Sequence, residues 1–260
     1  MAELSAVAAI AHRDFVKLLR DRVRIVGDLS LPLVLVLLLG PALQAGFGEP
    51  GGIEVTTFVF TGVLAQSVWQ SAALGLISLI ADREEDFSQE IFVSPISRYA
   101  IVAGKILGES LVALPQAVAI LVVGFVIGVP MTPLALLALL PVVLLTALFG
   151  GAFGLLVLSN LRSQRTASQV FPFVLLPQFF LAGVFNPVDS LPLPLAVLSA
   201  LSPMRYAVEL VRGVFYAIQP GRLETPPHLP LEVTLGVIAV AGLAFITVGT
   251  RLFVRSERNR

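Results

Sequence analysis

The 260-residue chain contains no cysteine, only two lysines and two histidines, and few charged residues of either sign. The absence of cysteine excludes disulfide bonds, thiolate chemistry and cysteine metal sites. Charged residues make up 13% of the sequence and hydrophobic residues 57%, with a mean hydropathy of +0.93. This composition is far more apolar than that of an ordinary soluble domain. It predicts an all-α integral membrane protein in which residues 1–260 form a single membrane domain.

Several catalytic and binding motifs are also missing. A phosphate-binding P-loop requires Gly-x-x-x-x-Gly-Lys-Ser/Thr, but Gly104-Lys105 is followed by Ile106, and Tyr99 occupies the first glycine position. Both histidines lie outside the apolar runs, which argues against an intramembrane Ser-His protease or a histidine metal site. A net charge of +0 and a pI near 6.7 argue against a nucleic-acid partner. We therefore expect no catalytic residues and no metal or ATP bound by this chain.

The apolar runs predict six membrane spans. The first covers residues 25–45, and the second covers residues 55–80, which carry no charge over 26 positions. Residues 110–161 are also uncharged, but as one helix they would be about 78 Å long, more than twice the thickness of a bilayer core. The VPMTP segment at 129–133 is expected to divide them into a third span that ends near residue 128 and a fourth at 134–158. The fifth and sixth spans are expected at 170–185 and 233–250.

Residues 81–98 form the densest polar segment between the apolar runs. Five acidic residues are followed by an apolar patch at 91–93, and Pro95 disfavours helical geometry at the residue before it. The pattern predicts a short amphipathic helix whose acidic side chains favour its N-terminal turns. Ser97 is then positioned to cap the next helix. The alternative is a solvated loop that only joins the second and third spans.

Basic residues predict the orientation of the chain. Residues 1–24 combine apolar positions at helical spacing with a basic face, which is typical of a helix in the membrane interface with its basic side chains toward anionic head groups. A plain positively charged anchor is the alternative. Fourteen of the 17 Lys and Arg residues fall on one predicted side, so the positive-inside rule places both termini and residues 81–98 in the cytoplasm.

Residues 186–216 are apolar but interrupted by prolines. The uncharged stretch at 190–204 has only fifteen residues, which is too short to span a bilayer and favours a re-entrant or interfacial segment. Arg205, Glu209 and Arg212 follow at helical spacings of four and three and predict a local ladder of ion pairs. We therefore expect an external re-entrant hairpin between the fifth and sixth spans.

Two of these segments resemble a known family. The acidic start, hydrophobic patch and SPISR ending of residues 84–98 resemble the coupling helix of type-2 permeases of ATP-binding cassette (ABC) exporters, of the daunorubicin-resistance and polysaccharide-export kind. The proline-rich segment at 186–213 resembles the external hairpin of the same permeases. The resemblance implies a plasma-membrane subunit that moves an amphipathic drug, lipid or glycan outward. It further implies two copies of a separate ATPase that binds ATP and Mg²⁺, a second permease copy or close paralogue, and contact with membrane lipid.

The resemblance also assigns roles to particular residues. It implies that the coupling segment contacts the ATPase through Glu84, Glu85, Phe87, Glu90, Ile91, Phe92, Val93, Ser94, Pro95 and Arg98. The second and fifth spans line the central path in the family, which nominates Gln66, Trp69, Gln70, Phe173, Gln178 and Phe179, although ordinary helix packing is the alternative for each. The external hairpin is marked by Pro203, Arg205, Tyr206, Glu209 and Arg212. A non-transporting scaffold, an assembly subunit or a channel remains the alternative function.

Overall fold

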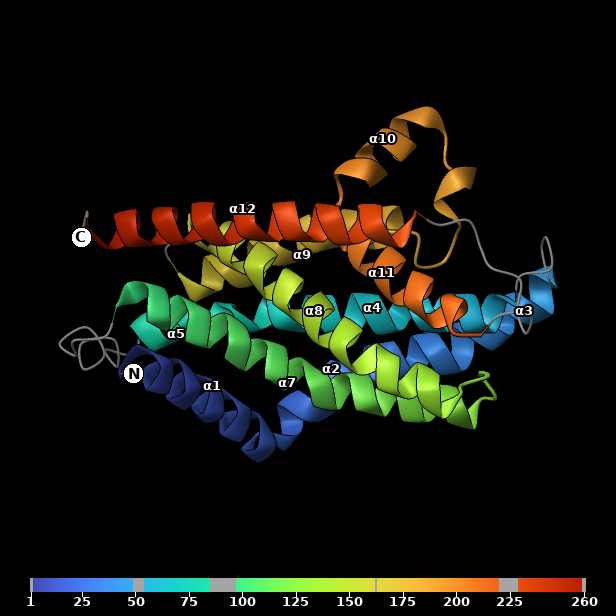
Figure 1. Cartoon of the computed structure of the whole chain (residues 1–260), viewed down its shortest axis with the longest axis horizontal. Helices are drawn as coiled ribbons and strands as arrows, with labels where there is room; N and C mark the ends of the chain where they lie inside the picture. The colour runs from blue at the N-terminus through green and yellow to red at the C-terminus, as the bar shows by residue number, and fades with distance from the viewer. Residues whose placement is uncertain (1, 49–53, 85–96, 162, 220–228, 259–260) are drawn as a thin grey trace.

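The computed structural model describes residues 2–48, 54–84, 97–161, 163–219 and 229–258, and all regular elements in these ranges are helical. Figure 1 shows an elongated bundle in which α4 lies inside and α12 runs along one side. The elements are α1 (Ala2–Arg20), α2 (Arg22–Val34), a π-helical segment (Leu35–Leu39), α3 (Gly40–Phe47), α4 (Val55–Gly75), α5 (Ile77–Glu84), α7 (Arg98–Val126), α8 (Pro133–Leu158), α9 (Gln164–Leu181), a 3-10 turn (Val188–Ser190), α10 (Leu193–Leu201), α11 (Pro203–Ala217) and α12 (Leu231–Arg258).

Five segments of the described chain are long and apolar enough to cross a membrane: Arg22–Gly46, Val55–Asp82, Arg98–Val126, Pro133–Leu158 and Leu231–Arg255. They correspond to the predicted spans one to four and six. The fifth predicted span coincides with α9, which is not among them. Its 18 residues begin with the polar sequence QRTASQ, so only its second half is strongly apolar. The structure thus supports a multi-span helical membrane protein and leaves the count of six as a prediction.

Local sequence signals set the helix ends around α7 and α8. The Ser97 side chain accepts a hydrogen bond from the Ala100 amide at 3.2 Å, as the sequence predicts. The long apolar stretch is divided at the predicted place, because Gly128 adopts a positive φ of 89° just after α7. Thr132 then caps α8 through the Ala135 amide, and Pro133 occupies its first turn.

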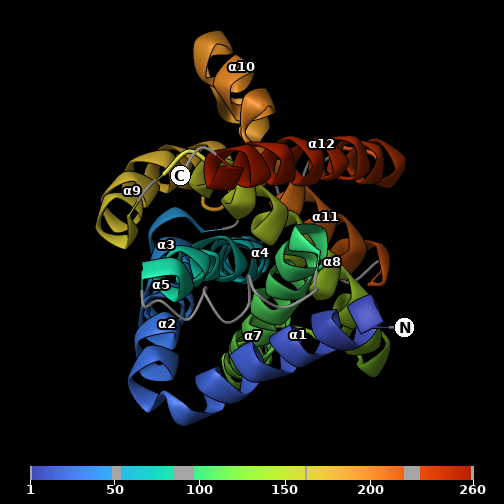
Figure 2. The same ribbon diagram turned by 90° about the vertical axis from the view of Figure 1, so that its left-hand side faces the viewer.

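The N-terminal region is two helices rather than one run to residue 24. The helix α1 ends at Arg20, and Asp21 caps α2 by accepting a hydrogen bond from the Arg24 amide at 2.9 Å. Arg22 and Arg24 therefore belong to the first span. Figures 1 and 2 show that α1 and α2 meet at a sharp corner, with α1 lying across α7. The cause is the capping side chain of Asp21, which starts a new helix within the basic stretch.

Glycines allow α8 to pack closely on α4. A Cβ atom added at Gly150 would collide with the Trp69 carbonyl oxygen, and one at Gly154 would lie 2.5 Å from the Ala73 carbonyl oxygen. The glycines of the GGAFG segment at 150–154 thus let the two helix backbones approach closely. The Trp69 ring lies 4.9 Å from the Phe153 ring, and the Phe149 and Phe245 rings, 5.7 Å apart, extend this aromatic contact to α12.

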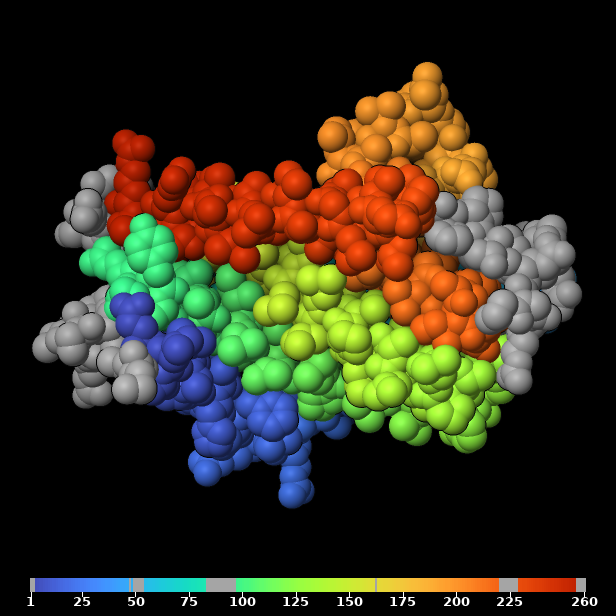
Figure 3. Space-filling model, in the orientation of Figure 1, coloured from blue at the N-terminus to red at the C-terminus, as the bar shows by residue number. Residues whose placement is uncertain are grey.

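The two ends of the bundle differ. Figure 1 places the N-terminus, the end of α5, the start of α7 and the C-terminus at one end. The space-filling view in Figure 3 shows α10 projecting from the body near the opposite end. The side chains of Leu193 and Leu201 on α10 are 78% and 73% exposed. The termini thus share one end with the helices that flank residues 85–96.

Candidate functional site: a buried ion cluster and an amide-lined pocket

Lys105 is the centre of a buried ion cluster between α1, α5 and α7. Its ammonium lies 2.9 Å from Asp14 Oδ2, 3.3 Å from Asp82 Oδ2 and 3.8 Å from Glu109 Oε1. The Lys105 and Asp14 side chains are only 2% and 3% exposed. A buried charge is stable only when opposite charges and hydrogen bonds replace the lost water. The position of Lys105 therefore depends on carboxylates from three different helices.

Basic residues of α1 close the cluster on one side. Arg13 Nη2 lies 2.6 Å from Asp82 Oδ2 and 3.0 Å from Asp14 Oδ1, and the Lys17 ammonium lies 3.4 Å from Asp82 Oδ1. Burial alone would lower the pKa of Arg13, but the carboxylates of Asp82 and Asp14 outweigh it and raise that pKa above its usual value. Within this chain, Arg13 and Lys17 thus pair with carboxylates, while the orientation of the basic face of α1 toward head groups stays a prediction.

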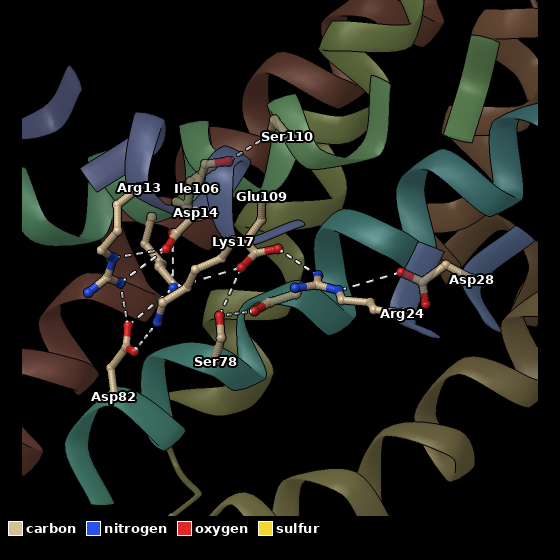
Figure 4. A network of polar contacts seen from close by, with 12 residues as sticks. Arg13, Asp14, Lys17, Arg24, Asp28, Ser78, Asp82, Ile106, Glu109 and Ser110 are labelled. Atoms are coloured by element: carbon tan, nitrogen blue, oxygen red, sulfur yellow. Dashed lines mark hydrogen bonds and ion pairs between the residues drawn. The ribbon is translucent and has the colours of Figure 1, made fainter. Parts of the chain in front are cut away.

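Glu109 and Arg24 extend the cluster to α2. Glu109 is 1% exposed, accepts a hydrogen bond from Ser78 Oγ at 2.8 Å and lies 3.1 Å from Arg24 Nη2. Arg24 Nε lies 3.5 Å from Asp28 Oδ2, a pairing that the i,i+4 spacing of the two residues on one helix allows. Figure 4 shows the continuous network. We use the name ion cluster for its four cations and four carboxylates: Arg13, Lys17, Arg24, Lys105, Asp14, Asp28, Asp82 and Glu109.

Two glycines of α7 bring α1 close enough to complete the cluster. A Cβ atom added at Gly104 would lie 3.0 Å from Ile10 Cβ, and one at Gly108 would lie 3.1 Å from Ala11 Cα. These glycines are four residues apart and share one face of α7. Small residues at this spacing let helix backbones approach. The close approach places Asp14 beside Lys105.

A pocket of about 150 Å³ with several amide and hydroxyl side chains in its wall lies next to the cluster, between α2, α4 and α7. Gln66 Nε2 donates a hydrogen bond to Gln70 Oε1 one helical turn away, and Gln116 Nε2 donates to the Asp28 carbonyl at 2.9 Å. Gln116 Oε1 is buried and has no hydrogen-bond partner among the described residues. The pocket is lined by Gly27, Asp28, Leu31, Pro32, Gln66, Ser67, Gln70, Ser71, Leu74 and Gln116.

The structure brings together only two of the six residues nominated for the pathway, Gln66 and Gln70. Trp69 is fully buried and faces α8 instead, where it packs on Phe153. Gln178 on α9 accepts hydrogen bonds from Ser202 Oγ and the Met204 amide, both at 3.4 Å, and so joins α9 to the start of α11. The positions of Trp69 and Gln178 are those of packing and joining residues within this chain.

The two nominated phenylalanines lie on different parts of α9. The Phe173 side chain is 80% exposed on its outer face. Phe179 contacts two other rings, with its centroid 5.7 Å from that of Phe180 and 5.0 Å from that of Phe185. Neither residue lines the amide pocket. The predicted pathway residues therefore do not form one continuous surface within a single chain.

Most of the predicted ATPase-contacting segment lies outside the described residues. This applies to Glu85, Phe87, Glu90, Ile91, Phe92, Val93, Ser94 and Pro95. Of the two flanking residues, Glu84 is the last residue of α5 and Arg98 the first of α7. Arg98 Nη1 donates to the Val254 carbonyl of α12 at 3.5 Å. The described part of the chain thus shows what brackets the segment, and the ion cluster lies on both bracketing helices.

The hairpin residues anchor α11 at the other end of the bundle. Pro203 begins α11, and the Tyr206 hydroxyl donates to the Ala200 carbonyl at 2.7 Å. Of the predicted ladder, the first step is confirmed, with Arg205 Nε 3.7 Å from Glu209 Oε1.

Arg212 has a different environment from the one the ladder predicts. It is 3% exposed, its guanidinium carbon lies 3.7 Å from the Phe58 ring centroid, and Nη2 donates to the Phe58 carbonyl at 3.2 Å. Arg212 therefore contributes to the contact between α11 and α4.

Sequence reasoning missed the ion cluster. Lys105 and Glu109 are visibly four residues apart, but their partners Asp14 and Asp82 lie 91 and 23 positions away from Lys105 in the chain. The one available signal is the glycine pair at 104 and 108 within an otherwise apolar helix. It predicts a close helix neighbour without identifying it.

The fold and site define a polytopic helical membrane protein with a charge network beside the segment between its second and third spans. The family model described as ABC-2 type transporter matches residues 5–216. The chain belongs to this family.

Relatives with curated descriptions agree with this assignment. The chain is 24% identical over 210 residues to "Putative transport permease ycf38" of Cyanophora paradoxa, covering 79% of this chain and 72% of that protein. It is 26% identical over 190 residues to "Nodulation protein J" of Rhizobium leguminosarum bv. viciae, covering 72% and 73%. It is 30% identical over 142 residues to "Probable multidrug ABC transporter permease YbhR" of Escherichia coli (strain K12), covering 54% and 38%. The relatives are thus described as permeases or as a nodulation protein.

Proposed function

We propose that this chain is the membrane-spanning subunit of an ATP-driven exporter and that a separate ABC ATPase hydrolyses the ATP. Membership of the ABC-2 transporter family supports an association with such an ATPase. The observation that carries the proposal is the ion cluster, which joins α1 to the end of α5 and to the first half of α7. The helices α5 and α7 flank residues 85–96. A force applied to that segment would therefore act directly on helices that the ion cluster holds together.

In this proposal residues 84–98 contact the ATPase, with the acidic side chains facing water and the apolar patch at 91–93 facing the partner. An apolar patch within an otherwise polar, water-facing sequence is typical of an interaction site. Two permease chains, or this chain and a paralogue, would assemble with two ATPases at the end that carries both termini. That end would be cytoplasmic, in agreement with the distribution of Lys and Arg.

The cargo would be an amphipathic drug, lipid or glycan. The described wall residues offer amides and hydroxyls, with Asp28 as the one ionisable side chain among them and Arg24 beside it. Such groups bind polar uncharged parts of a molecule, while the surrounding apolar helices accommodate an apolar part. Gln66 and Gln70 are the pathway residues that this pocket supports. The names of the relatives, which include a probable multidrug permease, are compatible with this range of substrates.

Replacing Phe92 with Asp tests the docking assignment. An aspartate in an apolar contact would lose its hydration without gaining a partner, so we expect association with the ATPase to weaken by at least about tenfold. Insertion in the membrane should be unchanged, because the residue lies in a polar segment between spans. Co-purification of the ATPase with the tagged permease measures the effect.

Phe92→Leu is the matched control, because it keeps an apolar side chain of similar reach and should retain the ATPase. Equal recovery of the ATPase with the Asp and Leu variants would show that residue 92 is outside the contact. If no ABC ATPase associates with the parent chain, the exporter proposal is wrong, and a scaffold or channel function takes its place.

A further inference from the structure

Arg24 links the buried part of the ion cluster to Asp28, a wall residue of the amide-lined pocket. Its Nη2 atom lies 3.1 Å from Glu109 Oε2, and its Nε atom lies 3.5 Å from Asp28 Oδ2. Asp28 is part of the pocket wall, and its carbonyl accepts the hydrogen bond from Gln116, another wall residue. One guanidinium group on α2 thus lies between Glu109 of α7 and Asp28 at the pocket.

We propose that Arg24 is a positioning residue that couples the state of the pocket to the state of the ATPase-docking end. This inference rests on the proposed function, because it assumes that an ATPase docks beside α5 and α7. Arg24 would act through Glu109 and Asp28 without itself binding ATP or performing chemistry. Movement of the end of α5 would change the shape of the pocket, and occupation of the pocket would change the docking end.

The contacts form an uninterrupted series between the two regions. Asp82, two residues before the end of α5, lies 3.3 Å from the Lys105 ammonium. Lys105 lies 3.8 Å from Glu109, which contacts Arg24, which contacts Asp28 at the pocket. Figure 4 labels Asp82 and Asp28 at the two ends of this series and shows Glu109 and Arg24 between them. No step requires a residue outside the described chain.

Burial makes the central steps of this series effective. Glu109 and Lys105 are 1% and 2% exposed, so water and salt screen their interaction much less than they would at a surface. A guanidinium group presents donors on separate nitrogens and can contact two carboxylates at once, which a single ammonium does with more difficulty. An arginine at position 24 therefore suits a link between Glu109 and Asp28.

Coupling between two sites is reciprocal by thermodynamic linkage. If nucleotide binding by the ATPase changes the affinity of the pocket for a ligand, then that ligand, once bound in the pocket, changes the affinity for nucleotide by the same factor. A purely structural ion pair would stabilise the fold and produce neither effect. This difference makes the proposal testable independently of transport.

The absence of cysteine allows a direct measurement in the assembled complex. Ser71 lines the amide-lined pocket and also a smaller neighbouring pocket that shares Asp28 and Gln116. Ser71→Cys would place a single thiol there. Its rate of reaction with a small methanethiosulfonate reagent is measured in the complex with the ATPase, both without nucleotide and with ADP and vanadate trapped in the ATPase.

With Arg24 present, we expect trapping to change the reaction rate of Cys at position 71 by about fivefold or more, the usual lower range of coupling between sites. In Arg24→Gln the change should be largely lost, because the link between Glu109 and Asp28 is cut. Arg22→Gln is the matched control, because Arg22 is an exposed arginine in the same turn of α2 and should leave the response intact.

A second variant separates coupling from damage to the fold. In Arg24→Gln, Glu109 keeps Ser78 and Lys105, so the variant is expected to assemble and to trap vanadate. Asp28→Asn removes the same link at a side chain that is 43% exposed. It should abolish the response equally, and the double variant should lose no more than either single variant, because the two residues act in one series.

Several results would overturn the proposal. An undiminished response in Arg24→Gln or Asp28→Asn refutes the role of Arg24, as does a parent whose Cys at position 71 ignores trapping. In these cases normal trapping in the parent complex would leave the proposed function standing. Failure of the parent to bind an ATPase or trap nucleotide refutes the proposed function and this inference with it.

Discussion

The contact between α1 and α7 and the contact between α4 and α8 use the same backbone device to different ends. In each, two glycines four residues apart let the helices approach closely, Gly104 and Gly108 in one and Gly150 and Gly154 in the other. The α1–α7 contact buries Lys105 with Asp14. The α4–α8 contact buries Trp69 against Phe153 and contains no ion pair among the described residues.

This difference indicates which contact can change and which cannot. At the α4–α8 contact the glycines meet helix backbone and the aromatic rings pack on one another, and any displacement of this close-packed arrangement opens a void. The ion cluster offers alternatives, because Asp82 lies within 3.4 Å of three cations and Lys105 within 3.8 Å of three carboxylates. A small displacement there exchanges one partner for another. The charged α1–α7 contact can therefore adjust to small movements of the helices, whereas the aromatic α4–α8 contact is expected to stay rigid.

Replacing Lys105 with Met should have the largest effect on stability. It leaves Asp14, Glu109 and Asp82 with one cation fewer in a buried site, and breaking a buried ion pair in this way costs about 3–5 kcal/mol. Trp69, the chain's one tryptophan, is fully buried and reports unfolding in detergent through its emission.

Lys17→Met is the control for that experiment. Lys17 also lies near Asp82 but is 59% exposed, so its loss should cost less than about 1 kcal/mol. Similar unfolding midpoints for the Lys105 and Lys17 variants would show that the buried ion cluster contributes no more to stability than an exposed ion pair does.

Gly150→Ala is expected to have the next largest effect. The added Cβ atom would collide with the Trp69 carbonyl oxygen, which belongs to the backbone and cannot move away alone. Overpacking of this kind costs about 1–3 kcal/mol. The same unfolding measurement applies. In the control Gly236→Ala the new Cβ atom meets nothing within 4 Å, so a loss of stability there as large as at Gly150 would contradict the view of α4–α8 as a fixed contact.

Replacing Gln66 and Gln70 together with Leu should have the smallest effect on stability, within about 1 kcal/mol, because both partners of a local hydrogen bond are removed. If the two amides line the pathway, the stimulation of ATPase activity by substrate should differ between this variant and the parent. The compounds tested are an anthracycline, a lysophospholipid and a lipid-linked sugar.

Thr247→Val serves as the control for the paired Gln variant, since this exposed hydroxyl on α12 bonds only within its own helix among the described contacts. If the paired Leu variant matches the parent with all three compounds, the amides are structural. The face of α4 that carries Gln66 and Gln70 would then belong to the rigid part of the bundle, together with the α4–α8 contact.

The sequence by itself determined the features that depend on neighbouring residues. The helix starts at Ser97 and Thr132 and the break near Gly128 follow from capping side chains and from glycine and proline, which act within one turn. The pairs Arg24–Asp28 and Arg205–Glu209 follow from helical spacing. The family could also be recognised, because its motifs are short and continuous in the chain.

Only the tertiary structure decided which charges meet. The sequence predicts that Arg13 and Lys17 face head groups. In the structure, the glycine face of α7 brings α1 close to α5, and both side chains contact Asp82. Trp69 reads as a pathway residue beside Gln70, but the direction in which α4 faces depends on the glycines of α8, eighty positions later. Periodicity shows that a helix has faces, whereas the neighbour of each face is set by how all the helices pack at once.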